Sequence, residues 1–185
     1  MATERDIELL AVESDITRYP SDVIVNAANE SLLGGGGVDG AIHRAAGPQL
    51  LEACRRLHGA KTGESKMTDA FGISTARRII HTVGPVYARY TPARAAELLA
   101  DCYRSSLDLA SEYGSIAFPA ISTGVYGYPA PDAARVAVAT IRDWIARHPA
   151  TALRRITLIA FSRPALDALR AAIDEHPDEQ QPDER

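Results

Sequence analysis

Residues 23–43 read Val23-Ile24-Val25-Asn26-Ala27-Ala28-Asn29, then Glu30-Ser31-Leu32-Leu33, then Gly34-Gly35-Gly36-Gly37-Val38-Asp39-Gly40-Ala41-Ile42-His43. An apolar strand is thus followed by two asparagines, a four-glycine loop and the start of a helix. Strand ends in open α/β sheets face ligand crevices, glycine lets backbone N–H groups approach an oxyanion, and a helix N-terminus adds partial positive charge. This order predicts a site for a sugar phosphate and favours a nucleotide sugar as the ligand.

The length and charge of the chain limit its architecture and its partners. At 185 residues, of which 46% are hydrophobic, the chain can bury one full core. We therefore expect one domain over residues 1–174 and an acidic, disordered tail over residues 175–185. The 24 acidic and 20 basic residues give a formal net charge of -4, which argues against extended nucleic-acid binding.

Cysteine usage and the apolar runs place the chain in a broad class. Cys54 and Cys102 have no nearby partner or histidine cluster, so we predict two buried free thiols and no metal ion. The sequence has no run of about 18 apolar residues and no basic segment leading into an apolar one at its start. We expect a cytoplasmic monomer that uses no cofactor and binds no membrane.

Apolar runs alternate with helical patterns along the chain. Strands are predicted at residues 7–12, 23–27, 66–70, 78–83, 116–118 and 156–161. Helices are predicted at residues 38–46, 49–57, 93–113, 132–146 and 165–174, with Gly114 ending the third of them. Strands separated by helices imply a largely parallel sheet between two helical layers, with ligand loops at the carboxyl ends of the strands.

A second glycine-containing loop, Pro119-Ala120-Ile121-Ser122-Thr123-Gly124-Val125-Tyr126-Gly127-Tyr128-Pro129, leaves the strand at 116–118. If this strand lies beside the one at 23–27, the two loops can enclose a diphosphate with backbone N–H groups and the Ser122 and Thr123 hydroxyls. Tyr126 lies next to a glycine, so we expect it to be exposed and to contact the ligand. The alternative is that these glycines only permit tight turns.

Polar side chains near the first loop are the candidates for specificity and catalysis. The amides of Asn26 and Asn29 can bind vicinal sugar hydroxyls, or they can cap and close turns. Asp39, the second residue of its predicted helix, shares a helix face with His43. The helix N-terminus should favour the ionised form of Asp39, which can then orient and deprotonate a water. Asp39 as a dipole-compensating acid and His43 as a structural imidazole remain the alternatives.

Two further residues suit a purine. Asp15 can accept a hydrogen bond from an exocyclic amine, although a turn at Asp15-Ile16-Thr17 is an equal alternative. Phe161, at the end of the last predicted strand, offers a ring face for stacking, and a core position is its alternative.

Together these motifs resemble a macrodomain of the MacroD type. The resemblance runs from Asp6 to about Ala172 and rests on residues 15–17, 23–29, 32–43, 62–64, 80–85 and 118–129. It implies a three-layer α/β/α fold with a mixed, largely parallel sheet of six or seven strands, and binding of ADP-ribose. MacroD-like members remove mono-ADP-ribose from acidic protein side chains and deacetylate O-acetyl-ADP-ribose, so ADP-ribosylated proteins or that metabolite are the implied partners.

The resemblance also implies roles for individual residues. Asp39 would be the catalytic acid–base residue, assisted by His43, with Asn29 on the distal ribose. Asp15 and the Ile16 backbone would hold adenine against Phe161, although Ser162-Arg163-Pro164 stands where the family often has an acidic residue. The implied ligand contacts are Asp15, Ile16, Asn26, Asn29, Gly36, Gly37, Val38, Asp39, Ser122, Thr123, Gly124, Val125, Tyr126 and Phe161.

Three competing hypotheses remain at the level of sequence. A non-catalytic ADP-ribose reader would have the same pocket. Gly35-Gly36-Gly37-Val38-Asp39-Gly40 fits the fingerprint of an NAD-dependent oxidoreductase, but its glycines begin too far beyond the strand. Ala120-Ile121-Ser122-Thr123-Gly124 nearly matches the nucleophile elbow of a serine hydrolase, but Gly127 and Pro129 delay the helix that should follow.

Overall fold

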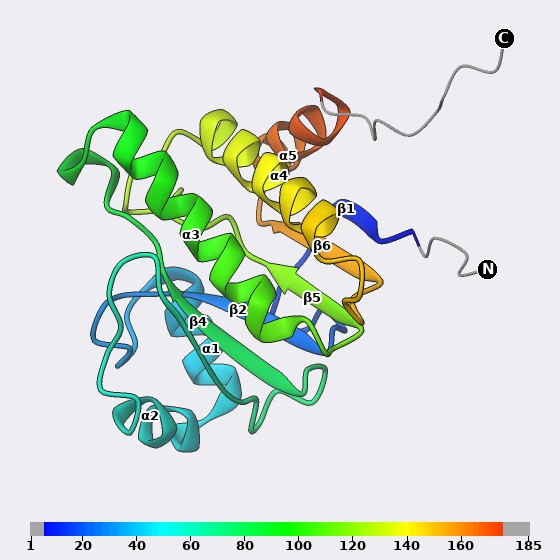
Figure 1. The fold of residues 1–185 in the computed structure, drawn as a ribbon. Helices are drawn as coiled ribbons and strands as arrows, with labels where there is room; N and C mark the ends of the chain where they lie inside the picture. Colours follow the sequence, from blue (N-terminus) through cyan, green and yellow to red (C-terminus); the bar gives the residue numbers. More distant parts are fainter. Residues whose placement is uncertain (1–5, 176–185) are drawn as a thin grey trace, which may run out of the picture.

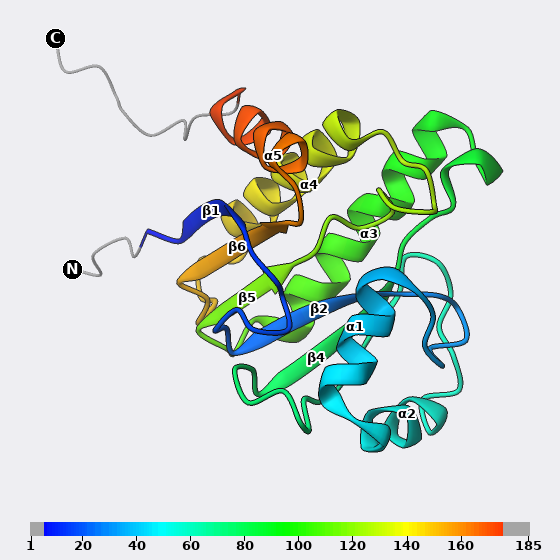
Figure 2. The ribbon, with the colours of Figure 1, turned by 180° about the vertical axis from the view of Figure 1, so that it is seen from behind.

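The computed structural model describes residues 6–175, and these form a six-stranded sheet with helices on both faces (Figures 1 and 2). The strands are β1 (Glu8–Glu13), β2 (Val23–Ala28), β3 (Ser65–Asp69), β4 (Arg78–Val83), β5 (Ser115–Phe118) and β6 (Arg155–Ala160). They lie in the order β1-β6-β5-β2-β4-β3. β3 pairs antiparallel with β4, and the other pairs are parallel. The predicted mixed, largely parallel sheet is confirmed, with six strands.

The helices form the outer layers of the sandwich. They are α1 (Gly37–Ala46), α2 (Pro48–Arg55), α3 (Pro92–Ala110), α4 (Ala130–Arg147) and α5 (Arg163–Glu175), with a 3-10 helix η1 at Tyr87–Arg89. One apolar core joins the sheet to α3, α4 and α5, and a second joins it to α1 and α2 (Figures 1 and 2). The predicted three-layer α/β/α architecture is therefore confirmed. No helix within residues 6–175 has the length and apolarity that crossing a membrane requires.

Strand β2 shows why both faces of the sheet are covered. Val23 and Val25 pack into the core beneath α3, whereas Ile24 and Ala28 pack into the core beneath α1 and α2. Side chains alternate between the two faces of a strand, so a nearly continuous apolar run has to be covered on both sides. β2 therefore lies inside the sheet, between β5 and β4.

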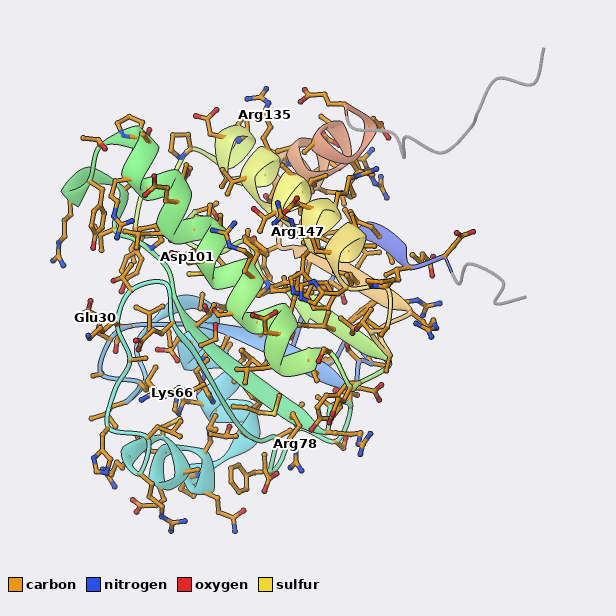
Figure 3. All side chains as sticks on the ribbon, in the orientation of Figure 1. Glu30, Lys66, Arg78, Asp101, Arg135 and Arg147 are labelled. Atoms are coloured by element: carbon orange, nitrogen blue, oxygen red, sulfur yellow. The ribbon has the colours of Figure 1, made fainter. Side chains whose placement is uncertain are left out.

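Charged side chains lie on the outward surfaces of the helical layers (Figure 3). Arg104 pairs with Asp101 on α3 at 2.8 Å, and Arg147 pairs with Asp143 on α4 at 3.0 Å. Exposed pairs of this kind contribute little to stability, about 0–1 kcal/mol each. Their position shows which helix faces meet water.

Several element boundaries differ from the predictions. α3 ends at Ala110 with Ser111 as its C-cap, so Gly114 is not the residue that ends it. The Gly114 N–H instead donates to Asp22 Oδ2 at 3.0 Å, just before β5. α1 begins at Gly37, which makes Asp39 its third residue rather than its second. Apart from Glu175, the last residue of α5, the predicted tail lies outside the described residues.

Both cysteines are buried and unpaired, as predicted. Cys54 belongs to the core beneath α1 and α2, and Cys102 belongs to the core beneath α3. Burial raises the pKa of each thiol to about 11.

Candidate active site

The first turn of α1 keeps its backbone donors uncapped. Its N-cap residue is Gly36, which has no side chain to accept from the turn. The first bond of the helix runs from the Gly40 N–H to the Gly36 carbonyl at 3.2 Å. The N–H groups of Gly37, Val38 and Asp39 therefore precede the intrahelical ladder, and the start of a helix is a favourable place for an anion.

The Asp39 carboxylate is buried beside this turn, with 4% of its surface exposed. Asn26 Nδ2 donates to Asp39 Oδ1 at 2.8 Å, and His43 Nε2 lies 3.4 Å from the same oxygen. A Cβ atom added to Gly35 would lie 3.2 Å from Asp39 Oδ2 and 3.5 Å from Asn29 Nδ2. Gly35 therefore lies between the carboxylate and the Asn29 amide, and only glycine leaves that space open.

The electrostatics of Asp39 differ from the prediction. Burial raises the pKa of its carboxyl group, while the Asn26 hydrogen bond and the nearby His43 lower it by less. We predicted that the helix N-terminus would favour the ionised form, but desolvation outweighs the favourable contacts. A raised pKa suits a carboxylate that has to take up a proton during a reaction.

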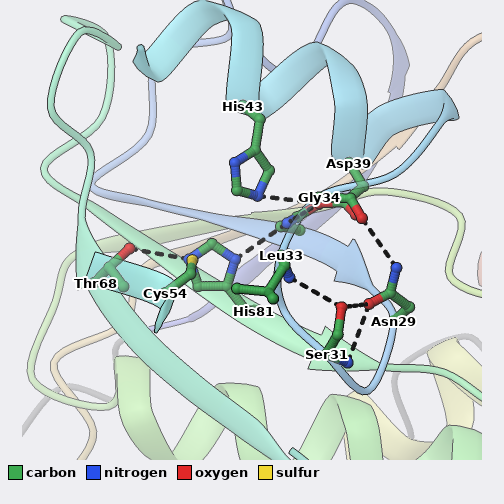
Figure 4. Close-up of polar contacts among 10 residues, drawn as sticks. Asn29, Ser31, Leu33, Gly34, Asp39, His43, Cys54, Thr68 and His81 are labelled. Atoms are coloured by element: carbon green, nitrogen blue, oxygen red, sulfur yellow. Dashed lines mark hydrogen bonds and ion pairs between the residues drawn. The ribbon is translucent and has the colours of Figure 1, made fainter. Parts of the chain in front are cut away.

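A chain of polar contacts extends behind Asp39 into the protein (Figure 4). Asn26 and His81 face each other in the register of β2 and β4, and Asn26 Nδ2 lies 3.1 Å from His81 Nδ1. His81 Nε2 lies 2.9 Å from Thr68 Oγ1 on β3 and 3.7 Å from Cys54 Sγ. Burial lowers the pKa of His81 to about 3, so its ring is neutral.

Asn26 is fully buried, which bears on the prediction that it contacts the ligand. Direct contact with a sugar would require its amide to leave Asp39 and His81. The arrangement therefore favours a role behind the site, in which Asn26 holds the Asp39 carboxylate.

The Asn29 side chain closes the first loop (Figure 4). Its Nδ2 donates to the Gly34 carbonyl at 3.0 Å, and its Oδ1 accepts from the Ser31 N–H at 3.1 Å and the Ser31 hydroxyl at 2.6 Å. This is the turn-closing role that the sequence left open. Asn29 remains partly exposed next to Gly35, so its contact with a ribose remains a prediction.

The second loop presents its backbone and turns its hydroxyls inward. Thr123 Oγ1 donates to the Ala120 carbonyl at 2.8 Å, and Ser122 Oγ is buried. The backbone of Ser122 has a φ of 65°, and a Cβ atom on Gly84 would overlap its hydroxyl oxygen. In this arrangement the two hydroxyls are directed into the protein, and their predicted contact with a diphosphate remains a prediction. Within residues 6–175, the N–H groups of Ser122, Gly124, Val125 and Tyr126 have no partner in the protein and can serve as donors.

The tip of the second loop carries two large side chains. Val125 is fully exposed, whereas Tyr126 is half-buried, contrary to the prediction that it would be exposed. The Tyr126 carbonyl accepts from the Tyr87 N–H of η1 at 2.9 Å, which ties the loop to the segment after β4. Burial raises the pKa of the Tyr126 phenol.

At the predicted adenine end, some groups are free to contact a ligand and others already have partners in the protein. Asp15 is exposed, and its Oδ1 accepts from the Thr17 N–H at 2.9 Å and the Thr17 hydroxyl at 2.7 Å. The side chain of Ile16 is fully buried, which leaves only its backbone for a ligand. Phe161 is 56% exposed, so its ring is not part of the core and remains available for stacking.

Three buried polar atoms at this site lack a hydrogen-bond partner within the described residues. They are Asn26 Oδ1, His43 Nε2 and Ser122 Oγ. Buried polar groups are nearly always satisfied in folded proteins, so the unsatisfied atoms of Asn26 and His43, both beside Asp39, support a functional role for this region. The same part of the chain, residues 6–175, contains no group of His, Cys, Asp and Glu side chains arranged to hold a metal ion.

The structure weakens the two remote hypotheses. β2 ends at Ala28 and α1 begins only at Gly37, so the glycines do not form the tight strand-to-helix turn of a dinucleotide-binding motif. Ser122 is buried, and none of the histidines among residues 6–175 contacts it. A serine nucleophile needs an adjacent base, so Ser122 does not fit that role.

Three residues that shape the site were missed from the sequence. His81 was not singled out, although it interrupts an apolar strand face between Ile79 and Val83. Gly40 allows close packing, because a Cβ atom there would lie 2.5 Å from the Gly35 carbonyl oxygen. Gly84 likewise allows close packing, because a Cβ atom there would overlap the Ser122 hydroxyl oxygen. The available signal for His81 was its polar ring between two apolar residues on one strand face.

Comparisons with known proteins agree with this geometry. A family model described as Macro domain matches residues 25–137. An O-acetyl-ADP-ribose deacetylase of Cronobacter sakazakii is 54% identical over 144 residues, covering 75% of this chain and 79% of the relative. The ADP-ribose glycohydrolase MACROD1 of Rattus norvegicus is 53% identical over 136 residues, covering 72% of this chain and 52% of the relative.

A solved structure shows the same fold. A variant of the Oceanobacillus iheyensis macrodomain, solved with ADPR, superposes with a TM-score of 0.85 at 41% identity, covering 94% of this chain and 96% of that one. Fold, sequence and the two glycine loops thus lead to one assignment. The chain belongs to the macrodomain family.

Proposed function

We propose that this protein binds ADP-ribose and hydrolyses ADP-ribosyl esters, removing mono-ADP-ribose from acidic protein side chains and deacetylating O-acetyl-ADP-ribose. The names of the two relatives and the ADPR of the Oceanobacillus structure support this choice of ligand and reaction. The observation that carries the proposal is the buried Asp39 carboxylate beside an uncapped helix start.

The proposed ligand lies across the carboxyl ends of the central strands. Its diphosphate accepts from the first turn of α1 and from the free N–H groups of Gly124, Val125 and Tyr126. β2 and β5 are parallel neighbours in the sheet, so the two sets of donors lie at the same edge of the sheet. The adenine ring extends toward Asp15 and Phe161, and the distal ribose lies near Asp39 and Asn29.

The proposed reaction uses Asp39 as a general base. The carboxylate takes a proton from a water as the water oxygen bonds to the anomeric carbon of the distal ribose. The bond from that carbon to the ester oxygen breaks, and the acidic side chain leaves as a carboxylate. Positive charge that develops on the ribose is offset by the nearby diphosphate, and the fixed loop donors hold the geometry. In deacetylation the same base takes a proton from a water that bonds to the acetyl carbonyl carbon. The bond from that carbon to the ribose oxygen then breaks, the ribose oxygen takes the proton from Asp39, and acetic acid leaves.

Substitution of Asp39 tests the proposal. We expect Asp39→Ala to lower the rate of hydrolysis of a glutamate-linked mono-ADP-ribosylated protein by about 10³-fold, since a general base contributes about 10²–10⁴. Calorimetry should show ADP-ribose affinity within a few-fold of the parent. Asp143→Ala is the control, because Asp143 is an exposed aspartate near the C-terminal end of α4, at the opposite end of that helix from the second loop.

The outcomes separate an enzyme from a reader. Retained hydrolysis in Asp39→Ala, with normal ADP-ribose binding, would show that Asp39 is not the base. A parent protein that binds ADP-ribose but releases none from the substrate would be a reader module.

A further inference from the structure

We propose that His81 is a positioning residue for Asp39, acting through the Asn26 amide. This inference rests on the proposed function, because it concerns how the catalytic carboxylate is held. His81 is fully buried and is separated from Asp39 by Asn26, so it acts without touching the substrate.

The hydrogen-bond roles along the chain are fixed by the number of available protons. Asn26 Nδ2 has two hydrogens, of which one goes to Asp39 Oδ1 and the other to His81 Nδ1. His81 Nδ1 is therefore an acceptor, and the ring proton lies on Nε2. That proton goes to Thr68 Oγ1, whose own hydrogen goes to the Asp69 carbonyl at 3.0 Å.

This directionality keeps the Asn26 amide in one orientation. A rotated amide would place its oxygen against the Asp39 carboxylate, and a proton on His81 Nδ1 would face the amide hydrogen. Each arrangement removes the donor that Asp39 needs. The neutral ring of His81, with its proton on Nε2, is thus what points an N–H at the carboxylate.

The surroundings of His81 argue against a role in packing alone. Its neighbours on the same strand face, Ile79 and Val83, are apolar and buried. An apolar side chain would fill this position without the cost of desolvating an imidazole. The histidine is useful because it accepts from Asn26 on one side and donates to Thr68 on the other.

The other titratable groups around His81 are few. His43 approaches from α1 and Cys54 from α2, and Asp39 is linked to His81 through Asn26. Lys66, its register partner on β3, directs its ammonium to the Leu57 and Gly59 carbonyls. A substitution at His81 should therefore be detected as a change in the titration of the Asp39 carboxyl group.

Replacing His81 with asparagine or with glutamine tests the roles of its two ring nitrogens separately. The oxygen of an asparagine can take the place of Nδ1, whereas a glutamine reaches the position of Nε2 and leaves Asn26 without an acceptor. We expect His81→Gln to lower kcat about ten-fold or more with KM within three-fold, since a hydrogen bond to a charged group contributes about 1.5–3 kcal/mol. His81→Asn should restore kcat to within about three-fold of the parent.

The pH profile of kcat distinguishes a loss of Asp39 positioning from a general loosening of the protein. Loss of the Asn26 donor removes a contact that keeps the Asp39 carboxyl ionised, so the acidic limb of kcat should move to higher pH in His81→Gln and stay in place in His81→Asn. Thr68→Val should act like His81→Gln, because it removes the acceptor that holds the ring proton on Nε2. This variant leaves His81 in place and serves if His81→Gln fails to fold.

Equal loss of kcat in His81→Gln and His81→Asn, with the acidic limb unmoved, would overturn the inference. A carboxyl ¹³C titration of Asp39 in the parent and in Thr68→Val provides a readout that does not depend on turnover. A parent without hydrolysis would refute the proposed function alone. An Asp39 titration that is identical in both proteins would refute the role of His81.

Discussion

The loops that follow β2 and β5 contribute different kinds of groups. The loop after β2 leads directly into α1, whose first turns carry Asp39 and His43, and the side chains behind it form a buried polar chain. The loop after β5 contributes backbone N–H groups, while its Ser122 and Thr123 hydroxyls face the protein. The proposed function thus assigns the chemistry to side chains of the first region and much of the diphosphate binding to the backbone of the second, so substitutions in each region should affect different kinetic constants.

Among the substitutions that compare the two loops, the largest effect should come from Gly40, which lets the first loop lie against α1. Gly40→Ala places a Cβ atom 2.5 Å from the Gly35 carbonyl oxygen, and backbone has to move. Overpacking costs about 1–3 kcal/mol, of which a gain of about 1 kcal/mol in helix propensity offsets part. We expect kcat to fall about 100-fold, as a 1 Å displacement of a catalytic group can produce.

Ala45→Gly is the control for this prediction. Ala45 is exposed on the same helix, so the change should cost about 1 kcal/mol of stability without moving Asp39. Urea unfolding and steady-state kinetics measure both variants. A normal kcat in Gly40→Ala would show that the first loop tolerates displacement.

A smaller effect, on binding, should come from Gly84 beneath the second loop. A Cβ atom there would overlap Ser122 Oγ and lie 2.7 Å from Ile121 Cγ2. We expect Gly84→Ala to raise the Kd for ADP-ribose about ten-fold, equivalent to about 1.4 kcal/mol, with kcat changed less than KM. Adding Ser122→Ala to the Gly84→Ala variant removes the hydroxyl oxygen and should restore most of the ADP-ribose affinity. If calorimetry finds no recovery, the clash with the Ser122 hydroxyl is not the cause of the weaker binding.

The smallest effect concerns pH and sharpens the contrast between the loops. In the proposed reaction Asp39 serves as a base only when it is ionised, so the rate should fall as the pH drops through its pKa. Burial raises that pKa, which places the acidic limb above the ordinary aspartate value of 3.8. Asn26→Ser should move the limb further up, because the Asn26 bond lowers the pKa. Gly84→Ala should leave the acidic limb unchanged. An acidic limb that moves equally in Asn26→Ser and Gly84→Ala would contradict the division of roles between the two loops.

Much of the fold followed from periodicity and glycine placement. The uninterrupted apolar run of β2 predicted a strand covered on both faces, and this is confirmed. The end of α3 was predicted three residues too late, because Gly114 was assigned to a helix cap. Its actual role depends on a hydrogen bond with Asp22, which is distant in sequence. Local pattern does not reveal such a partner.

The site was predictable in its loops but not in its electrostatics. Spacing alone placed Asp39 and His43 on one helix face. The burial that raises the pKa of Asp39 depends on how α1 packs against β2. The contact between Asn26 and His81 depends on the register between β2 and β4, which a single strand does not encode. Likewise, the inward turn of the Ser122 hydroxyl arises from the left-handed backbone at a non-glycine residue.

The two buried thiols can report local opening of the two helical layers. Cys54 is enclosed by the α1 and α2 layer and Cys102 by the α3 layer, and neither forms a thiolate readily at neutral pH. An alkylating reagent can therefore reach each sulfur only when its own layer lifts from the sheet. Each layer of the sandwich thus contains its own reporter thiol, and the ratio of the two labelling rates compares local opening of the α1 and α2 layer with local opening of the α3 layer.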